Sequence, residues 1–314
     1  MSIAKYIKVI GRGKDGAKPV NREEATDLML QILDGKVSDL EVGGFCIAMR
    51  IKGETELENA GFLDALDQRM NKIKSACPVV VIPTYNGARK LPALTPLLAL
   101  LLAREGKKHG FAVLMHGAMS DDTRVSSFEI LQAFGNTTTT KSLVFLNDNQ
   151  STLSTGQMAY VDTHVLSQGL GKLLNVRRTI GLRNPAHSIV KLMNPVDDSQ
   201  PACVITSYTH PEYLHSMTAT FKYMGTQAML MRGTEGEPVA DARRTPEMNV
   251  FKNGVTTCVQ EAQAGSLVKL PDLPADISAE NTARYMEAVL HGAKPVPEPI
   301  ATQVKHIVEL MRTN

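Results

Sequence analysis

The chain has 314 residues, of which 43% are hydrophobic and 21% charged, as is typical of globular proteins large enough to build a sizeable core. No apolar run approaches the roughly 18 residues that span a bilayer, and the opening "MSIAKYIKVIGRGKDG" has no signal-peptide pattern, so we expect a cytoplasmic protein with no membrane segment. The cysteines are scattered without metal-ligand spacing, which predicts reduced thiols and no metal: Cys46, Cys77, Cys203 and Cys258. A net charge of +2 does not by itself indicate a nucleic-acid partner.

Residues 1–74 are predicted to form a small all-helical domain. Asn21 with Glu24, and Thr55 with Glu58, have the spacing of capping boxes at helix starts. Apolar residues follow the first pair at helical spacing, and "LEVGGFCIAMRIK" predicts a helix between the two starts. The last helix is expected to run to the end of this range.

Residues 75–314 are predicted to form a larger α/β domain, because short apolar runs alternate with helical patterns. Strands are expected at 79–82, 112–115, 143–146, 203–206 and 228–231, and helices at 95–105, 126–134, from about 211, 280–292 and 300–312. Residues 159–193 are expected to be helical and to join the small domain. "VFKNGVTTCV" predicts a hairpin. The fold class is therefore α/β with a mostly parallel sheet, and the cleft between the domains is the expected binding site.

The stretch "VVIPTYNGARKLPALTPLLALLL" at 80–102 reads as a strand, a glycine-containing turn and a helix. Many α/β enzymes hold a phosphate at such a turn. This turn, however, has a single glycine, Gly87, and a bulky Tyr85, and it carries the cations Arg89 and Lys90. It is either a working phosphate cradle or one rebuilt for another ligand.

The order of motifs resembles the anthranilate phosphoribosyltransferase family, also called glycosyltransferase family 3, which shares its fold with the pyrimidine nucleoside phosphorylases. The motifs are "GFAVLMHG" followed by "VSSFEILQAFG", then "VRRTIGLRNPAHSIVKLMNP", "HPEY" and "MRGTEG". The resemblance covers nearly the whole chain. It implies the same small helical domain and large α/β domain.

The chain departs from the enzymes of that family in four places. Their glycine-rich Gly-Thr-Gly-Gly-Asp turn is "PTYNG" at 83–87, where Tyr85 is expected to fill the space that phosphates need. Their Asn-x-Ser-Thr phosphate group is "PALT", which keeps only Thr95. Their Lys-His-Gly-Asn becomes "MHGA" at 115–118, without the cation and the amide. Their Mg²⁺-binding Asp-Glu pair aligns with the apolar "PV" at 238–239, although two glutamates lie nearby.

These losses imply that no catalytic residue, metal or cofactor remains, because transfer of a ribosyl group from pyrophosphate needs fixed donors and usually Mg²⁺. The combination is similar to the TrpD2 or YbiB-like branch of the family, homodimers that bind nucleic acid and have no established catalysis. The remnant phosphate pocket would consist of Asn86, Gly87, Thr95, His116, Gly117, Ser126 and Ser127. Ser126 and Ser127 are also expected to cap the following helix.

The placement of charge supports a nucleic-acid partner independently of the resemblance. Residues 163–196 contain five cations and no acid, and residues 3–22 contain six cations against Asp15. Such segments either form a stripe for a phosphate backbone or are solvated surfaces that happen to lack acids. The cations that we expect to bind nucleic acid are Lys172, Arg177, Arg178, Arg183, Lys191, Arg89, Lys90, Arg124 and Lys14. Lys172, Arg183 and Lys191 are expected to be exposed, whereas Arg177, Arg178 and Arg183 also match arginines of the enzymes.

The sequence thus favours a non-catalytic protein that binds single-stranded DNA or RNA through its backbone, with tolerance of sequence. Aromatic residues are only 5% of the chain and tryptophan is absent, which disfavours a base-stacking platform. The alternative is an active glycosyl- or phosphoribosyltransferase with a changed substrate, because His116, Arg124, Ser126 and Arg183 persist at enzyme-like positions. A scaffold for a protein partner is a third possibility. The resemblance further implies a homodimer formed through the helical domain.

Overall fold

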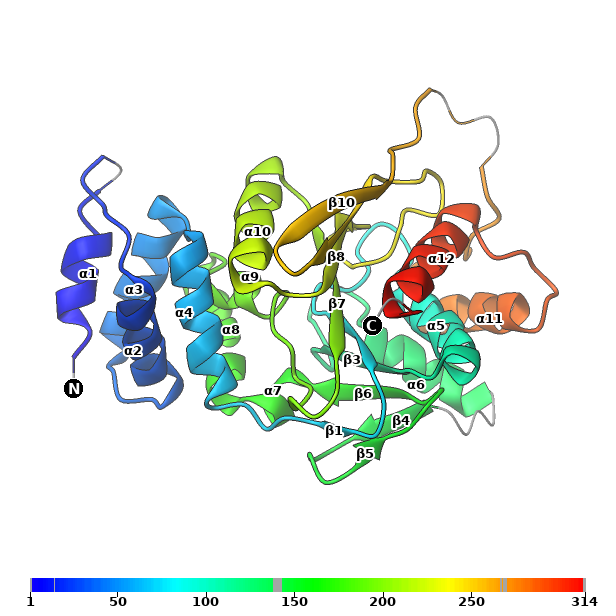
Figure 1. The fold of residues 1–314 in the computed structure, drawn as a ribbon, viewed down its shortest axis with the longest axis horizontal. Coiled ribbons are helices and arrows are strands. Elements are labelled where there is room, and N and C mark those ends of the chain that lie inside the picture. The colour runs from blue at the N-terminus through cyan, green and yellow to red at the C-terminus, as the bar shows by residue number, and fades with distance from the viewer. Residues whose placement is uncertain (1, 14, 138–142, 266, 268–269, 313–314) are drawn as a thin grey trace.

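A bundle of helices occupies one end of the molecule and an α/β domain the other (Figure 1). The computed structural model describes residues 2–13, 15–137, 143–265, 267 and 270–312. The helices of the bundle are α1 (Ala4–Ile10), α2 (Arg22–Leu33), α3 (Asp39–Lys52), α4 (Glu56–Asp67), α7 (Thr163–Leu166), α8 (Gln168–Ile180) and α9 (Ala186–Ile189). α8 packs against α2, and α9 against α4. The predicted class, a helical domain plus an α/β domain, is confirmed.

Capping boxes start the long helices of the bundle. Both predicted boxes are present, with the side chain of Asn21 capping α2 and that of Thr55 capping α4, and a third at Ser38 caps α3. α4 ends at Asp67, earlier than predicted, because the next residues leave the helix to make tertiary contacts. The backbone N–H of Asn71, for example, donates to the carbonyl of Leu166. The short helix α1 was not predicted.

Within the described residues, eight strands form one sheet in the order β10-β9-β8-β7-β2-β3-β6-β4. Its strands are β2 (Val79–Thr84), β3 (Ala112–Gly117), β4 (Leu143–Leu146), β6 (Met158–Asp162), β7 (Ala202–Tyr208), β8 (Ala228–Arg232), β9 (Met248–Lys252) and β10 (Val255–Gln260). The strands pair in parallel from β8 to β4, and β9 and β10 add an antiparallel edge. The predicted hairpin is confirmed, with Asn253 and Gly254 at positive φ in its turn. A separate parallel pair joins β1 (Lys74–Ser75) to β5 (Thr152–Leu153).

Strand β6 corrects the prediction of continuous helix from residue 159. It pairs with both β3 and β4, so it lies inside the sheet. A strand buried on both faces reads as an unbroken apolar run, which periodicity alone does not separate from a buried helix. The chain returns to the bundle only with α7.

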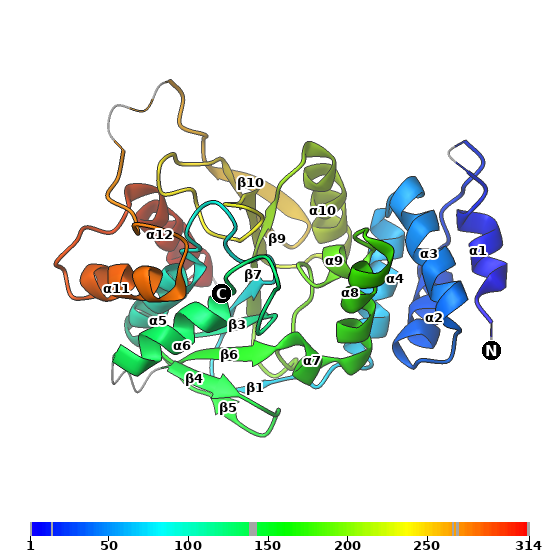
Figure 2. The same cartoon turned by 180° about the vertical axis from the view of Figure 1, so that it is seen from behind.

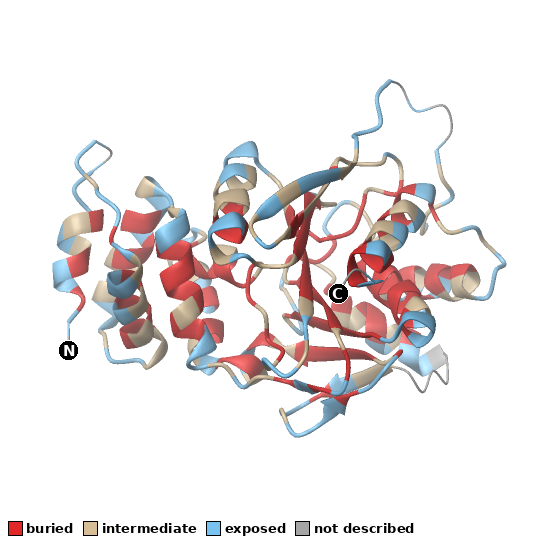
Figure 3. Ribbon diagram, in the orientation of Figure 1, coloured by how far each residue is buried: buried red, intermediate tan, exposed pale blue. Residues whose placement is uncertain are grey.

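Two apolar cores lie on the opposite faces of the sheet, and its central strands β2 and β3 are buried along their whole length (Figure 3). Alternate side chains of β2 enter different cores, Val79 and Val81 one, and Val80 and Ile82 the other. The second core is covered by α5 (Thr95–His109), α6 (Ser127–Thr137), α11 (Ala279–Leu290) and α12 (Glu298–Arg312) (Figure 2). The first is shared with the helical bundle and with α10 (Pro211–Met224). This arrangement brings the loops that follow β2, β3, β7 and β8 together beside the bundle. Within the described residues, no helix is long and apolar enough to cross a membrane.

Candidate functional site at the ends of the parallel strands

The carboxylate of Glu237 fills the turn that follows β2. Its side chain is only 1% exposed. One carboxylate oxygen accepts the backbone N–H groups of Asn86 and Gly87 at 2.8 and 3.0 Å. The other accepts the hydroxyls of Thr84 and Thr95 at 2.5 and 3.0 Å. Four donors therefore surround one buried anion that belongs to the chain itself.

A further hydroxyl supports this carboxylate from behind. The Thr84 hydroxyl lies 2.5 Å from that of Ser127, at the first residue of α6. A hydroxyl has one proton, and Thr84 uses its own toward Glu237, so Ser127 is the donor in this pair. Both side chains are buried. The start of α6 is thus tied to the same anion.

Glu235 fills a second, outer group of backbone donors. Its Oε2 accepts the N–H groups of Arg89, Lys90 and Leu91 at 2.7, 3.0 and 3.4 Å. Consecutive N–H groups that converge in this way form an anion-binding nest. Burial raises the pKa of the Glu235 carboxyl, but the three N–H donors outweigh burial, and its pKa lies below the usual value. The carboxylate is therefore charged at neutral pH.

The turn that carries both glutamates, residues 234–237, is called the acidic turn below. Its central carbonyl, that of Gly236, accepts hydrogen bonds from the Asn86 amide (2.8 Å), Lys191 Nζ (2.8 Å) and the Ser207 hydroxyl (3.0 Å). The guanidinium of Arg183 donates to the Asn86 side-chain oxygen at 2.8 Å. The acidic turn is thus fixed against the end of β2 and against β7.

Arg183 and Lys191 do not have the free, exposed side chains that we predicted for them. Both are partly buried and donate to groups inside the protein. Burial lowers the pKa of Lys191 to about 8. The segment that holds these residues has no acids, so its charge pattern resembles that of an exposed basic surface. The pattern does not reveal that the Lys191 ammonium already donates to backbone carbonyls.

Tyr85 does not occupy the phosphate space, contrary to expectation. Its ring packs edge-on against His187 with the ring centres 5.5 Å apart, and it lines a small cleft beside Arg177 and Arg178. The space is closed by Glu237 instead. Gly87 has a φ of 70°, and a Cβ there would lie 2.6 Å from the carbonyl oxygen of Val125, so a bulkier residue would be strained.

The remaining residues of the predicted pocket have mainly structural roles. Ser126 caps α6 in a box with Glu129, as predicted. A Cβ at Gly117 would lie 2.0 Å from the carbonyl oxygen of Thr84, so the glycine permits close strand packing. His116 is fully buried, neither ring nitrogen has a hydrogen-bond partner, and burial lowers its pKa to about 3. A neutral, enclosed imidazole supplies no charge to a ligand.

Four arginines crowd the rim of this region: Arg124, Arg177, Arg178 and Arg183. Burial, followed by the positive charges of Arg177 and Arg124, lowers the pKa of Arg183 below its usual value. Arg124 also donates to the carbonyl of Gly87 at 3.2 Å. The positive charges of these arginines therefore lie close enough to repel one another. Such an arrangement is stable only where anions lie nearby.

Acidic partners neutralise this rim only in part. Arg177 is paired with Asp121 at 2.8 Å, and Arg178 lies 3.5 Å from the more exposed Asp122.

Of the other predicted cations, Arg89 and Lys90 are exposed on the loop that forms the outer nest. Lys172 is exposed on α8 but does not line the cleft beside the arginines, and Lys14 lies outside the described residues.

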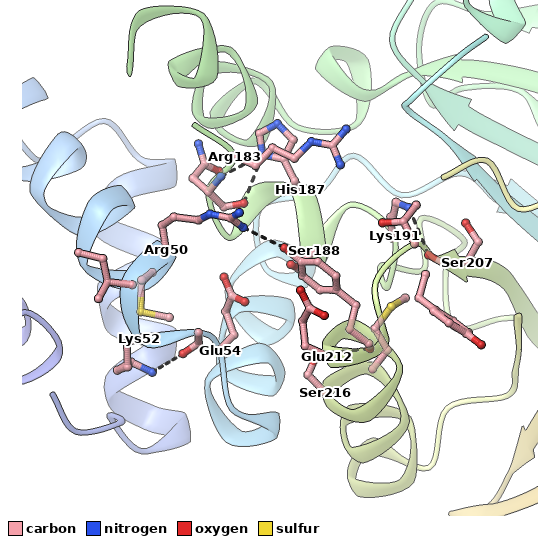
Figure 4. A pocket seen from close by; sticks show the side chains of 18 residues that line it. Arg50, Lys52, Glu54, Arg183, His187, Ser188, Lys191, Ser207, Glu212 and Ser216 are labelled. Carbon is pink, nitrogen blue, oxygen red and sulfur yellow. Dashed lines mark hydrogen bonds between the residues drawn. The ribbon is translucent and has the colours of Figure 1, made fainter. Parts of the chain in front are cut away.

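A cavity of about 420 Å³ separates the end of α3 from α9 and the start of α10 (Figure 4). The carboxylates of Glu54 and Glu212 point into it from two sides, and Arg50 donates to the Tyr213 hydroxyl at its edge at 3.1 Å. Burial raises the pKa of Glu54 to about 7. Sequence reasoning missed Glu54 and Glu212, because nothing local distinguishes them from surface acids. It noted the two glutamates of the acidic turn only as acids near the apolar Mg²⁺ positions, and did not predict that they accept the N–H groups of the turn after β2.

The residues present do not fit the Mg²⁺ ion that the enzyme family implies. The aligned residues, Pro238 and Val239, are buried and offer no side-chain ligand. The carboxylate oxygens of Glu235 and Glu237 are turned toward N–H and O–H donors, which occupy the space that a cation would need. In the described parts of the chain, no group of three or more His, Cys, Asp or Glu residues could hold a metal.

Comparison with known proteins gives a consistent set of relatives. Residues 4–70 match a family model described as glycosyl transferase family, helical bundle domain. The chain is 38% identical to the uncharacterized protein YbiB of Escherichia coli K12 over 97% of this chain and 92% of that protein. It is 25% identical to anthranilate phosphoribosyltransferase of Methanopyrus kandleri over 93% and 84% of the two chains.

Solved structures share the fold. The anthranilate phosphoribosyltransferase of Thermus thermophilus matches with a TM-score of 0.66 at 19% identity, over 98% of this chain and 93% of that one. The Saccharomyces cerevisiae protein, in complex with PRPP and Mg, matches with a TM-score of 0.68 at 12% identity, over 99% and 89%. At these identities the likeness establishes the fold alone.

The inner carboxylate predicts a large effect of a conservative substitution. Glu237→Gln keeps the shape but removes the charge that four donors surround, and it brings an NH₂ group toward groups that themselves donate. We expect the free energy of unfolding to fall by about 2–4 kcal/mol, since each hydrogen bond to a charged group contributes roughly 1.5–3 kcal/mol. Urea denaturation measures the loss. Glu105→Gln, which affects only contacts with Lys108 and His109 on the same helix, is the control and should cost at most about 1 kcal/mol. Equal stability of the two variants would contradict a structural role for the Glu237 charge.

Proposed function

The chain belongs to the YbiB-like branch of the anthranilate phosphoribosyltransferase superfamily, and we propose that it is a non-catalytic protein that binds single-stranded DNA or RNA with little sequence preference. One observation carries the proposal. The inner phosphate cradle is occupied by the chain's own Glu237, whereas, within the described residues, only Arg177 and Arg178 of the four arginines around it lie within 4 Å of a carboxylate. An external anion therefore finds the inner cradle occupied, and the arginines around the cradle are the groups that favour its binding.

The filled cradle argues against phosphoribosyl transfer. A pyrophosphate would need the N–H groups of Asn86 and Gly87, which already bind Glu237. Loss of a single oxyanion donor costs roughly 10²–10³ in rate, and here the cradle and the metal ligands are both missing. A transferase with a changed substrate would need the whole acidic turn to withdraw, against the bonds from Lys191, Ser207 and Asn86.

The arginine rim supports a polyanionic partner. The positive charges of Arg124 and Arg177 act on Arg183, so an added phosphate relieves repulsion as well as forming new pairs. A single strand can follow a compact cluster of charges at a protein edge more easily than a duplex, whose bending is costly. Contacts to phosphates carry no base information, so the binding should tolerate any sequence.

A homodimer is the second part of the proposal. Helix α3 exposes Leu40 (87%), Ile47 (39%) and Ile51 (59%), which share one face at helical spacing, with Gly43 and Gly44 between them. An apolar helix face of this kind, repeated on a second copy, forms the self-complementary interface of a two-fold dimer. The four cysteines are free thiols, which supports a reducing location such as the cytoplasm.

The absence of catalysis can be tested directly. With phosphoribosyl pyrophosphate, Mg²⁺ and anthranilate, we expect no product and no tight Mg²⁺-dependent binding of the pyrophosphate by calorimetry. The physical reason is that Glu237 already holds the donors of the cradle. Steady turnover at even about 0.01 s⁻¹, far below the usual range of 1–10³ s⁻¹, would refute this part of the proposal.

Nucleic-acid binding predicts a change in salt dependence when three exposed cations, two on the outer-nest loop and one of the four arginines, are reversed in charge. The triple variant Arg89→Glu, Lys90→Glu, Arg178→Glu should weaken binding of a labelled single strand and reduce the slope of log affinity against log salt by about two, since each lost phosphate contact contributes roughly 0.7. Fluorescence anisotropy at several salt concentrations measures both. A matched triple, Lys74→Glu, Lys107→Glu, Lys305→Glu, makes the same change in net charge at exposed lysines on β1, α5 and α12. Equal losses in the two triples would show non-specific charge effects only, and preference for duplex would contradict the single-strand proposal.

The dimer proposal predicts dissociation by one substitution in α3. Ile51→Lys places a charge in the apolar face, and light scattering should then report half the wild-type mass. The control is Val255→Lys, a 64% exposed residue on the edge strand β10, which should leave the mass unchanged. A wild-type protein that is monomeric at micromolar concentration would rule the dimer out.

A further inference from the structure

The two carboxylates of the acidic turn differ in their access to solvent. Glu237 is enclosed, and its partners are buried residues of the core. Glu235 is only partly buried, and the loop that it binds exposes the side chains of Arg89 and Lys90. The inner site is therefore closed, whereas a solute can reach the outer one.

The outer site has the form of an anion receptor. Three successive N–H groups, those of Arg89, Lys90 and Leu91, converge on one Glu235 oxygen, and the Lys90 N–H also reaches the other oxygen at 3.1 Å. The donors belong to a loop that ends before α5 begins at Thr95, so they do not depend on a helix terminus. A phosphodiester carries the same single negative charge as a carboxylate and presents two unesterified oxygens, so it suits the same donors.

Glu235 holds this position in a costly backbone conformation. Its φ of 54° lies in the left-handed region, which residues other than glycine, asparagine and aspartate seldom adopt. The neighbouring Gly236 carbonyl and the Glu237 carboxylate are anchored independently by their own donors. The Glu235 side chain can therefore leave the nest by rotating about its own bonds, without movement of the acidic turn.

We propose that the N–H groups of residues 89–91 form a binding site for one phosphate group of a nucleic-acid strand, and that Glu235 occupies the site until the strand displaces it. This inference rests on the proposed nucleic-acid function. The side chains of Arg89 and Lys90 flank the site, and the positive charge of Arg124 acts on Glu235. When the phosphate enters, these cations exchange an internal anion for an external one, and Glu235 moves into solvent.

The inference predicts that Glu235 weakens binding in the wild-type protein. Glu235→Ala should tighten binding of a labelled oligothymidylate by about five- to tenfold, because the competing carboxylate is gone. In this variant the slope of log affinity against log salt should become steeper by no more than roughly 0.7, the contribution of one further phosphate contact. Glu235→Gln keeps one oxygen that can accept from the nest but loses the charge, and should give an intermediate affinity. Circular dichroism confirms that each variant is folded.

The matched control is Asp122→Ala. It removes one exposed negative charge beside Arg178, close to the same rim, but Asp122 accepts none of the N–H groups of the nest. If the loss of any negative charge in this region strengthened binding, the affinity for the oligonucleotide would rise equally in both variants. A specific site would give a clearly larger gain for Glu235→Ala.

Two further measurements separate nucleic acid from free phosphate. Amide ¹⁵N resonances of residues 89–91 should shift when the oligonucleotide is added to wild-type protein, and inorganic phosphate should shift them in Glu235→Ala only. If wild type and Glu235→Ala bind the strand with the same affinity and the resonances do not move, the nest is not a phosphate site, and the proposed function stands without it. If neither protein binds any oligonucleotide, the proposed function fails, and phosphate shifts in Glu235→Ala would then indicate a site for free phosphate alone.

Discussion

The end of β2 is organised around a buried negative charge, the carboxylate of Glu237. An unpaired carboxylate inside a protein is strongly unfavourable, so the fold has to supply donors to it. They come from three elements, namely β2 through Thr84, the following turn through the N–H groups of Asn86 and Gly87, and α5 through Thr95. The positions of these elements relative to one another therefore depend on an acid that lies about 150 residues further along the chain.

The same constraint accounts for the cations that point inward. The acidic turn remains in place because its Gly236 carbonyl is held by Lys191 and Ser207, and Arg183 fixes the Asn86 side chain that also binds this carbonyl. In the sequence, Lys191 has the pattern of a surface cation in an acid-free segment, yet its neighbours in space are carbonyl oxygens. Charge patterning reports which side chains are charged, but not whether backbone dipoles already satisfy them.

Local rules predicted most of the fold. Capping boxes at Asn21 and Thr55, the alternation of strands and helices, and the Asn-Gly hairpin are short-range signals, and each was confirmed. The errors fall where tertiary contacts override such signals. α4 ends earlier than predicted, because the backbone N–H of Asn71 donates to the carbonyl of Leu166 in α7. β6 was mistaken for helix because a strand buried on both faces has no alternating pattern.

The candidate site was predictable only through the resemblance, and then only in part. Asn86, Gly87 and Thr95 do converge on an anion, as a former phosphate pocket implies. The identity of that anion could not be deduced, because no periodicity or spacing links residues near 86 to an acid at 237. Tyr85 was expected to close the space on grounds of size, yet its ring turns toward His187.

Filling the cradle with a carboxylate has a different consequence from deleting it. The backbone N–H donors are kept, and their bonds to the two glutamates hold the loop of Arg89 and Lys90, while Arg124 is bonded to the carbonyl of Gly87 in the same turn. The inner N–H donors are satisfied by the chain's own Glu237, and in the proposed function the exposed cations Arg89 and Lys90 act on an external anion. The proposed change of role, from holding one pyrophosphate to following a strand of phosphates, then requires no new fold, because an internal acid closes the deep site and leaves its rim intact.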